Sequence, residues 1–272
     1  MGEITAAAPR PRSFAKRHPA VTLWLAFTAL FVLLAGVWIA IFAANGKSFI
    51  WYADGIKQHY PALVYYGRWL REAARCLVSG APIPTWDMSI GYGNDIVTTL
   101  SYYVMGDPLN LLAAFVPSQY GEQLLEFLML LRVYLAGLAF MPFSLHHKNS
   151  RFGTLLGAVA YAFSAWTLQT ALTEPFFIIP MYCFPLVLLG ADHIFEGRRP
   201  ILYIAAIALA ALSNFLFFYM IALLLVLYAV VKYFRTYGVG QLRTLWPLAG
   251  KFVGVSLGGI ALAAGGRSHA AF

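Results

Sequence analysis

The chain has 272 residues, of which 61% are hydrophobic and only 11% are charged. Soluble domains carry about 25% charged residues, so this composition excludes an ordinary soluble globular protein. The net charge of +8 comes without a basic stripe of interleaved aromatic residues, and no nucleic-acid partner is expected. The 2 cysteines, Cys76 and Cys183, suggest neither a disulfide framework nor a zinc pair.

The N-terminal part predicts a first membrane span. Residues 1–19 are polar and basic, and residues 20–44 form an apolar run. A cleaved signal peptide has an apolar core of about 7–15 residues, so this longer run indicates a retained transmembrane helix. Because basic residues gather on the cytoplasmic side of such helices, we expect residues 1–19 in the cytoplasm.

Residues 45–123 are rich in Gly, Pro, Tyr, Trp and Asp and are too polar to span a membrane. They predict a long first extracytoplasmic loop that carries interfacial helices. Within it, Arg68, Arg71, Glu72 and Arg75 recur at helical spacing, which predicts an amphipathic helix over residues 57–79 on the membrane surface. The arginines would either meet lipid phosphates or form an ordinary solvated face with Glu72.

Residues 124–264 predict a membrane bundle, because apolar runs of about 20 residues cross a hydrocarbon core of about 30 Å. The run from Ile201 to Phe234 is too long for one span, and its polar break at Ser213-Asn214 predicts a short helix followed by a full one. The fold class is therefore an all-α integral membrane protein, a polytopic helical bundle of about seven transmembrane helices. The expected spans cover residues 20–44, 124–143, 152–171, 175–195, both parts of 201–234, and 246–264.

Charge distribution predicts the orientation of the bundle. With the N-terminus in the cytoplasm, most of the 19 basic residues fall on the cytoplasmic side, as the positive-inside rule requires. Most of the 11 acidic residues then fall outside, so acid chemistry is expected there. The protein is thus expected to be a multi-pass membrane protein with its N-terminus in the cytoplasm and residues 265–272 as a short tail.

The most informative polar segment follows the first span and contains Asp54. An acid just beyond a helix end, among interfacial aromatic residues, would sit where a lipid-borne group meets a water-soluble acceptor. A carboxylate there could act as a general base on a hydroxyl group. The alternative is a plain Asp-Gly turn. Gln58 and His59 belong to the same segment and are predicted to contact substrate, His59 alternatively being a simple interfacial polar group.

Five further polar residues are predicted substrate contacts, each with a structural alternative. Arg132 lies within an apolar span, so it should face a polar cavity or an acid; the alternative is snorkelling or an ion pair with another span. Asp107 precedes Pro108 and would otherwise cap a short helix. Asn94 lies in a Gly-rich segment that is better interpreted as a tight turn than as a phosphate loop. Glu174 and Asn214 map to outer span ends, where they would line the cavity of Asp54 or serve as turn and cap residues. No cofactor is expected; the outer acids could bind one divalent cation, but no spacing demands a metal site.

Several motifs in order resemble bacterial YfhO-family membrane proteins over about residues 20–235. No single motif is specific to this family, whereas the occurrence of all six in the same order is. The motifs are Asp54 with Gln58-His59-Tyr60-Pro61, Trp86 with Gly91-Tyr92-Gly93-Asn94, Tyr102-Tyr103, Asp107-Pro108-Leu109-Asn110-Leu111-Leu112, Tyr161-Ala162-Phe163-Ser164, and Ser213-Asn214-Phe215 with Tyr219-Met220.

The resemblance implies a GT-C-type membrane glycosyltransferase. Such enzymes move a sugar from a polyprenyl-phosphate carrier to an extracytoplasmic cell-envelope acceptor, such as a teichoic-acid-like polymer or glycan. The acid in the first outer loop, here Asp54, is implied to be catalytic, most simply in one inverting displacement. Stabilising the leaving phosphate then becomes the main electrostatic task, and Arg132 is the basic candidate for it.

Two other functions stay open. A transporter or flippase subunit for an envelope precursor would use acids and Arg132 along an alternating-access path, although no internal repeat is visible. An inactive truncated fragment or scaffold fits the fact that YfhO-like proteins are usually several times longer. The expected partners are the polyprenyl-phosphate sugar donor, the envelope acceptor and membrane lipids.

Overall fold

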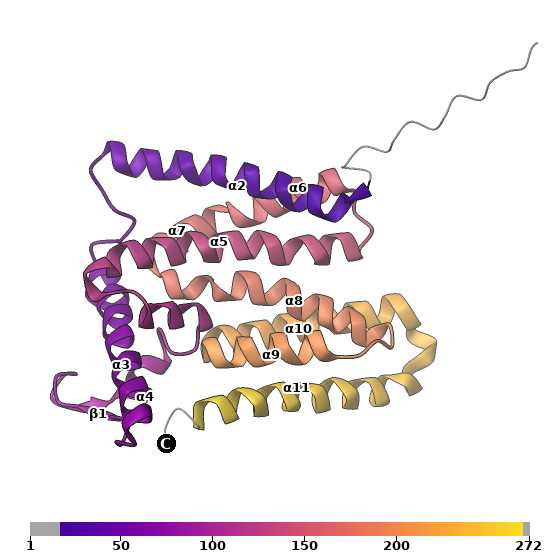
Figure 1. The fold of residues 1–272 in the computed structure, drawn as a ribbon. Coiled ribbons are helices and arrows are strands. Elements are labelled where there is room, and N and C mark those ends of the chain that lie inside the picture. The colour runs from indigo at the N-terminus through magenta and orange to yellow at the C-terminus, as the bar shows by residue number, and fades with distance from the viewer. Residues whose placement is uncertain (1–16, 269–272) are drawn as a thin grey trace, which may run out of the picture.

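The computed structural model describes residues 17–268 and is almost entirely helical (Figure 1). The helices of the bundle run roughly parallel and antiparallel to one another, and a separate layer of short elements covers one end of them (Figure 1). The bundle comprises α2 (Pro19–Ala44), α5 (Gly121–His146), α6 (Arg151–Ala162), α7 (Ala165–Thr173), η4 (Pro175–Ile178), α8 (Ile179–Phe195), α9 (Ile201–Ser213), α10 (Phe215–Tyr237), η5 (Val239–Thr244) and α11 (Leu245–Ser268).

Within the described residues, six helical segments are long and apolar enough to cross a membrane. The helix α9 has 13 residues and is therefore only about 20 Å long, shorter than a full span. It is the short helix that the polar break at Ser213-Asn214 predicts, so the polytopic all-α membrane fold is confirmed. The six segments are Pro19–Ala44, Ser118–His146, Arg151–Thr173, Pro175–Phe195, Phe215–Tyr237 and Val239–Gly265.

The span predicted over residues 152–171 falls within the candidate span Arg151–Thr173. This span consists of two helices, α6 and α7, because the Ser164 side chain accepts a hydrogen bond from Thr167 N and starts a new helix. The tail expected from residue 265 is still helical as far as Ser268. The predicted cytoplasmic segment 1–19 lies outside the described residues up to position 16, as does the tail from position 269.

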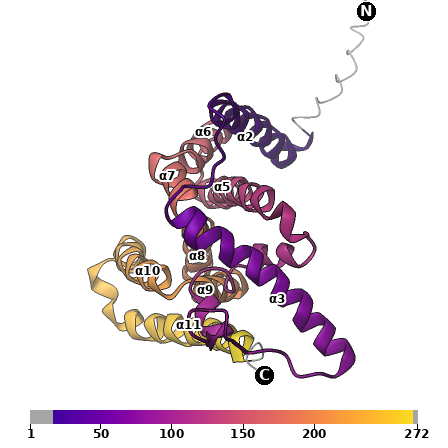
Figure 2. The same ribbon diagram turned by 90° about the vertical axis from the view of Figure 1, so that its left-hand side faces the viewer.

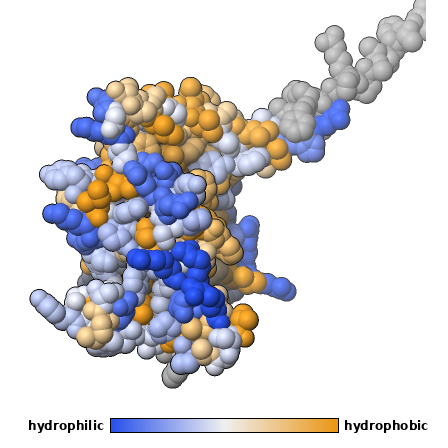
Figure 3. Space-filling view, turned by 60° about the vertical axis from the view of Figure 1, so that its left-hand side comes forward, coloured by the Kyte–Doolittle hydropathy of each residue, from blue (hydrophilic) through white to orange (hydrophobic). Residues whose placement is uncertain are grey.

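The layer over one end of the bundle is formed by the segment between α2 and α5. It contains η1 (Gly55–His59), α3 (Tyr60–Ser79), β1 (Trp86–Asp87), β2 (Asn94–Asp95), α4 (Ile96–Ser101), η2 (Pro108–Ala114) and η3 (Ser118–Tyr120). Figure 2, a view onto this end, shows α3 lying across the ends of the bundle helices. We call this the α3 end and the other the opposite end. Figure 3 shows hydrophilic side chains gathered over the α3 end, with apolar ones toward the flanks of the bundle.

The helix α3 is the amphipathic helix expected over residues 57–79, preceded by a single π-helical turn, η1. Its apolar side, including Leu63 and Tyr66, is buried. Gly67 allows close contact with η2, since a Cβ atom at Gly67 would lie 2.5 Å from the Ala113 carbonyl oxygen. Arg71 donates hydrogen bonds to the carbonyl oxygens of Ala113 and Val116. Arg71 therefore anchors η2 and is not part of a lipid-facing stripe.

Small residues also fix the contact between α8 and α9. A Cβ atom at Gly190 would lie 2.6 Å from the Cα atom of Tyr203. Small residues at such positions let helix backbones approach closely inside membranes. The hairpin of α8 and α9 therefore depends on Gly190.

We expect Gly190→Ala to lower the free energy of unfolding by about 1–3 kcal/mol, the usual cost of overpacking a close contact. Gly36→Ala is the matched control, because no atom lies within 4 Å of a Cβ atom there. Unfolding of the full chain in detergent measures both variants. If the two variants are equally stable, α8 and α9 can move apart at Gly190 without a loss in the free energy of unfolding.

The predicted orientation places Ser48 outside and Ser150 in the cytoplasm. Both residues are exposed, so each is changed to Cys in a Cys76→Ser background. An impermeant thiol reagent applied to intact cells should label position 48 and leave position 150 unlabelled. The reverse pattern would invert the orientation of the bundle.

Candidate functional site

Asp54 lies at the α3 end, directly before η1, and its side chain is half-buried. The π-helical turn begins here because Ile56 N donates to Trp51 O at 3.0 Å. The Asp54 carboxylate accepts a hydrogen bond of 2.5 Å from the Gln58 amide. Gln58 in turn accepts a hydrogen bond from the Tyr103 hydroxyl. The predicted site residues Asp54 and Gln58 are therefore held together by a turn and by a tyrosine from the segment after α4.

Glu174 comes from a distant part of the chain, between α7 and η4, and meets this turn. Its carboxyl Oε2 lies 2.5 Å from Nε2 of His59, and its carboxyl group also hydrogen-bonds that of Asp54. The structure thus brings Asp54, His59 and Glu174 into one cluster. The expectation that Glu174 lines the same site as Asp54 agrees with this geometry; the contact of either residue with substrate stays a prediction.

Burial controls protonation in this cluster. It raises the pKa of Glu174, and the charge and hydrogen bond of Asp54 add to the rise. Burial also lowers the pKa of His59 to about 4, against the opposing effect of Asp54. These shifts favour a neutral imidazole at His59 and favour the neutral form of Glu174 more than usual. The two carboxyl groups therefore lie beside a histidine that is not a permanent imidazolium.

His59 itself is enclosed by aromatic rings. Its side chain is fully buried, with ring centroids 5.0 Å from Phe176 and 5.3 Å from Tyr103. Its Nδ1 has no hydrogen-bond partner among the described residues. An unprotonated Nδ1 has the lower free energy at such a position, because it leaves no N–H group unpaired. His59 then donates from Nε2 to Glu174 and orients that carboxyl group.

Arg132 and Asp107 form a buried ion pair next to the cluster. Both side chains are fully buried, and Arg132 Nη2 and Nε lie 2.7 and 2.8 Å from Asp107 Oδ2. Arg132 also donates to Asn110 Oδ1 at 2.7 Å. The Asp107 side chain accepts from Leu109 N as well, which is the predicted cap of η2. Neither side chain faces an open surface. Their predicted contact with a substrate stays a prediction, and their burial argues against it.

Two other predicted contacts lie apart from the cluster. Asn214 is buried, caps α10 through Leu216 N and Phe217 N, and donates to Tyr102 O. It therefore supports the segment that carries Tyr103 without touching Asp54. Asn94 is exposed in the β1–β2 hairpin, where Gly91 and Gly93 adopt φ angles of 63° and 103°. The tight turn expected there is confirmed, and the predicted sugar contact of Asn94 stays a prediction.

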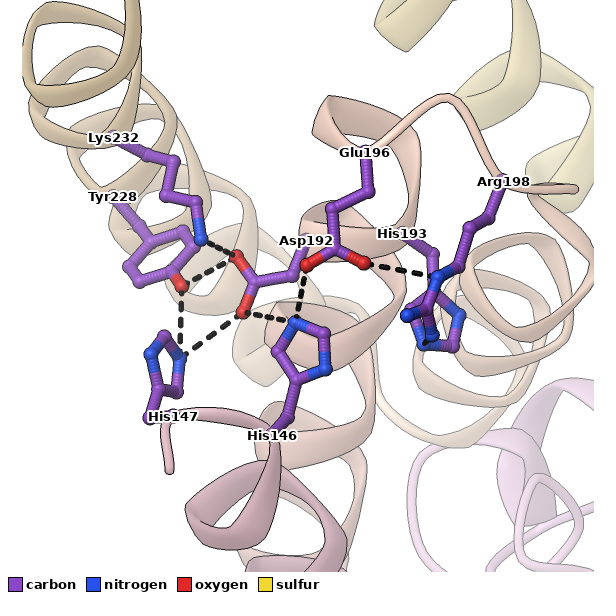
Figure 4. A network of polar contacts seen from close by, with 8 residues as sticks. All are labelled: His146, His147, Asp192, His193, Glu196, Arg198, Tyr228 and Lys232. Atoms are coloured by element: carbon purple, nitrogen blue, oxygen red, sulfur yellow. Dashed lines mark hydrogen bonds and ion pairs between the residues drawn. The ribbon is translucent and has the colours of Figure 1, made fainter. Parts of the chain in front are cut away.

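A second polar network, which the sequence analysis did not predict, lies at the opposite end (Figure 4). Asp192 of α8 is fully buried and accepts from Tyr228 at 2.6 Å and from Lys232 at 2.8 Å. His147 lies 3.0 Å from Asp192 Oδ2, without the alignment of a hydrogen bond. Glu196 pairs with His146 and Arg198. Every carboxylate of this network has a cationic or histidine partner. The spacing of these residues along the chain gave no local signal for this network.

These features define the chain as a polytopic helical membrane protein with a carboxyl cluster at one end of its bundle. The sequence pattern of the family described as bacterial membrane protein YfhO matches residues 26–265. The chain belongs to this family, and the family and the apolar helices place it in a membrane. Comparisons with curated proteins and with solved structures find no match. Among residues 17–268, no group of three or more His, Cys, Asp or Glu residues could hold a metal ion.

We expect Arg132→Met to lower the free energy of unfolding by about 3–5 kcal/mol, because it leaves the buried Asp107 carboxylate without its cation. Arg75→Met is the matched control. Arg75 and Glu72 form an exposed ion pair of 2.8 Å, and such pairs contribute about 0–1 kcal/mol. Unfolding in detergent measures both, and a small loss for Arg132→Met would show that Asp107 finds another partner.

Proposed function

We propose that the chain is a GT-C-type membrane glycosyltransferase. It would move a sugar from a polyprenyl-phosphate carrier to an extracytoplasmic cell-envelope acceptor, such as a teichoic-acid-like polymer or glycan. The observation that carries the proposal is the cluster of Asp54, Glu174 and His59 at the α3 end. Membership of the YfhO family supports the reaction class. The bundle would sit in the bacterial cytoplasmic membrane with its N-terminus in the cytoplasm.

Asp54 is the proposed general base. In the reaction, the acceptor hydroxyl oxygen would attack the anomeric carbon while the bond from that carbon to the phosphate oxygen breaks. The hydroxyl proton would pass to Asp54, and the lipid phosphate would leave with the bonding electron pair. Proton transfer to a positioned carboxylate lowers the barrier of such a step.

Glu174 and His59 would position and tune this base. Burial and Asp54 raise the pKa of Glu174, which makes Glu174 the proposed neutral partner of the pair. Asp54 would be the group that accepts the substrate proton. Gln58 and Tyr103 would fix the carboxylate orientation through their hydrogen bonds. Lys57 is exposed on the same turn and could face the leaving phosphate in place of the buried Arg132.

If Asp54 is the base, Asp54→Asn should lower sugar transfer by about 10²–10⁴-fold, the usual contribution of general base catalysis. Asparagine keeps the size of the side chain but cannot accept the proton. Asp95→Asn is the matched control, since Asp95 is a helix cap that accepts from Thr98 N. Transfer is measured in reconstituted membranes with a polyprenyl-phosphate sugar and an envelope acceptor.

Donor binding and membrane insertion should be unchanged in Asp54→Asn. Equal transfer by the wild type and Asp54→Asn would remove Asp54 from catalysis. A wild type that transfers no sugar but moves the lipid across the membrane would instead support the flippase alternative.

A further inference from the structure

A cleft of about 550 Å³ lies between α3 and the β1–β2 hairpin. The proposed reaction does not use it. Aromatic, basic and acidic side chains all line it, which distinguishes it from a lipid-filled groove. The residues used below are Tyr65, Arg68, Trp69, Glu72, Trp86 and Asp87.

Most polar groups of this cleft are already engaged. Asp87 accepts from the Tyr65 hydroxyl at 2.6 Å and from Ser89 N at 2.7 Å. The Trp69 indole donates to Pro84 O at 2.8 Å, and Glu72 pairs with Arg75. These bonds give the cleft a fixed wall.

Arg68 and the ring of Trp86 are more open, although the Trp86 indole N–H donates to Met88 Sδ at 3.4 Å. Arg68 is exposed and makes no hydrogen bond or ion pair with any residue of the described part of the chain. Trp86 is held by the hairpin, yet 59% of its surface is exposed. The cleft thus offers an open aromatic face, an unoccupied guanidinium group and neighbouring carboxylate acceptors.

This combination fits one kind of ligand. The aromatic face suits the C–H face of a sugar ring, because Trp is large, rigid and amphipathic. The carboxylates of Asp87 and Glu72 can accept hydrogen bonds from sugar hydroxyl groups. The guanidinium group binds phosphate or carboxylate in two-pronged geometry. The exposed Trp86 ring beside Arg68 favours an anionic group carried on a sugar ring over a lipid phosphate, which would leave the Trp86 ring without a partner.

We propose that this cleft binds a sugar unit carrying a phosphate or carboxylate group, through Trp86 and Arg68. Resting on the proposed function, we assign this sugar unit to a distal part of the acceptor. Tyr65 and Glu72 lie seven residues apart in α3 and so share one face of the helix. Tyr65 lies about 7.5 Å beyond the start of α3 at Tyr60, and Asp54 lies farther back, before the whole π-helical turn η1, so one monosaccharide would not touch both. The acceptor would therefore be an oligomer that extends along α3.

The test measures binding of two soluble oligosaccharides, one phosphorylated and one containing uronic acid, to the full chain in nanodiscs. Arg68→Gln should weaken binding of the preferred oligosaccharide by about 10-fold or more, because it removes a charge-assisted hydrogen bond. Trp86→Ala should weaken it by about 10-fold, because it removes the aromatic surface on which the sugar ring packs. The matched controls, Arg151→Gln and Trp246→Ala, change exposed residues elsewhere and should bind as the wild type does. The oligosaccharide that binds more tightly identifies the anionic group.

Unchanged binding in both cleft variants would overturn the proposal. The proposal would also be overturned if the cleft variants lost binding to anionic lipid vesicles but kept oligosaccharide binding. The cleft would then bind the membrane surface. Repeating the measurement in Asp54→Asn separates the two proposals. If the oligosaccharide binds this cleft but the wild type transfers no sugar, the glycosyltransferase proposal fails and the binding site stands.

Discussion

The buried pair of Arg132 and Asp107 is the interaction on which the α3 end depends. A lone arginine within a membrane span costs at least about 2.5 kcal/mol, so the fold must supply it with an acid. It does so from the segment outside the spans, where Asp107 also caps η2. The pair thereby holds η2 against α5. In turn η2 supports α3 through the contact of Gly67 with Ala113.

The same pair reaches the carboxyl cluster through one aromatic ring. The Arg132 guanidinium lies 5.3 Å from the centroid of Phe176, and the His59 ring lies 5.0 Å from the same residue. Phe176 follows Glu174 after a single proline. A shift of Arg132 would therefore move both Glu174 and His59 relative to Asp54. Arg132 therefore lies close enough to support the proposed catalytic groups through Phe176.

The sequence predicts a feature well when the residues that form it lie near one another in the chain. Apolar runs and helical spacing are local, so they predict the spans, the amphipathic α3 and the break before Asn214. The cap at Asp107 is also local. The pairing of Asp107 with Arg132 joins residues far apart in the chain, and the sequence predicts only that Arg132 needs some polar partner. The break at Ser164 was missed because the apolar run continues on both sides of it. The network around Asp192 was missed because its members come from three separate helices.

The acids at the two ends of the bundle have different partners, and this difference favours chemistry at the α3 end. At the opposite end, Asp192 pairs with Lys232 and is flanked by Tyr228 and His147. At the α3 end, Asp54 and Glu174 meet each other and a neutral imidazole, with no lysine or arginine bonded to either among the described residues. Burial and the neighbouring Asp54 raise the pKa of Glu174, so this carboxyl group takes up a proton more readily than an ordinary one. A proton acceptor at the membrane surface requires this property, and a purely structural ion pair does not.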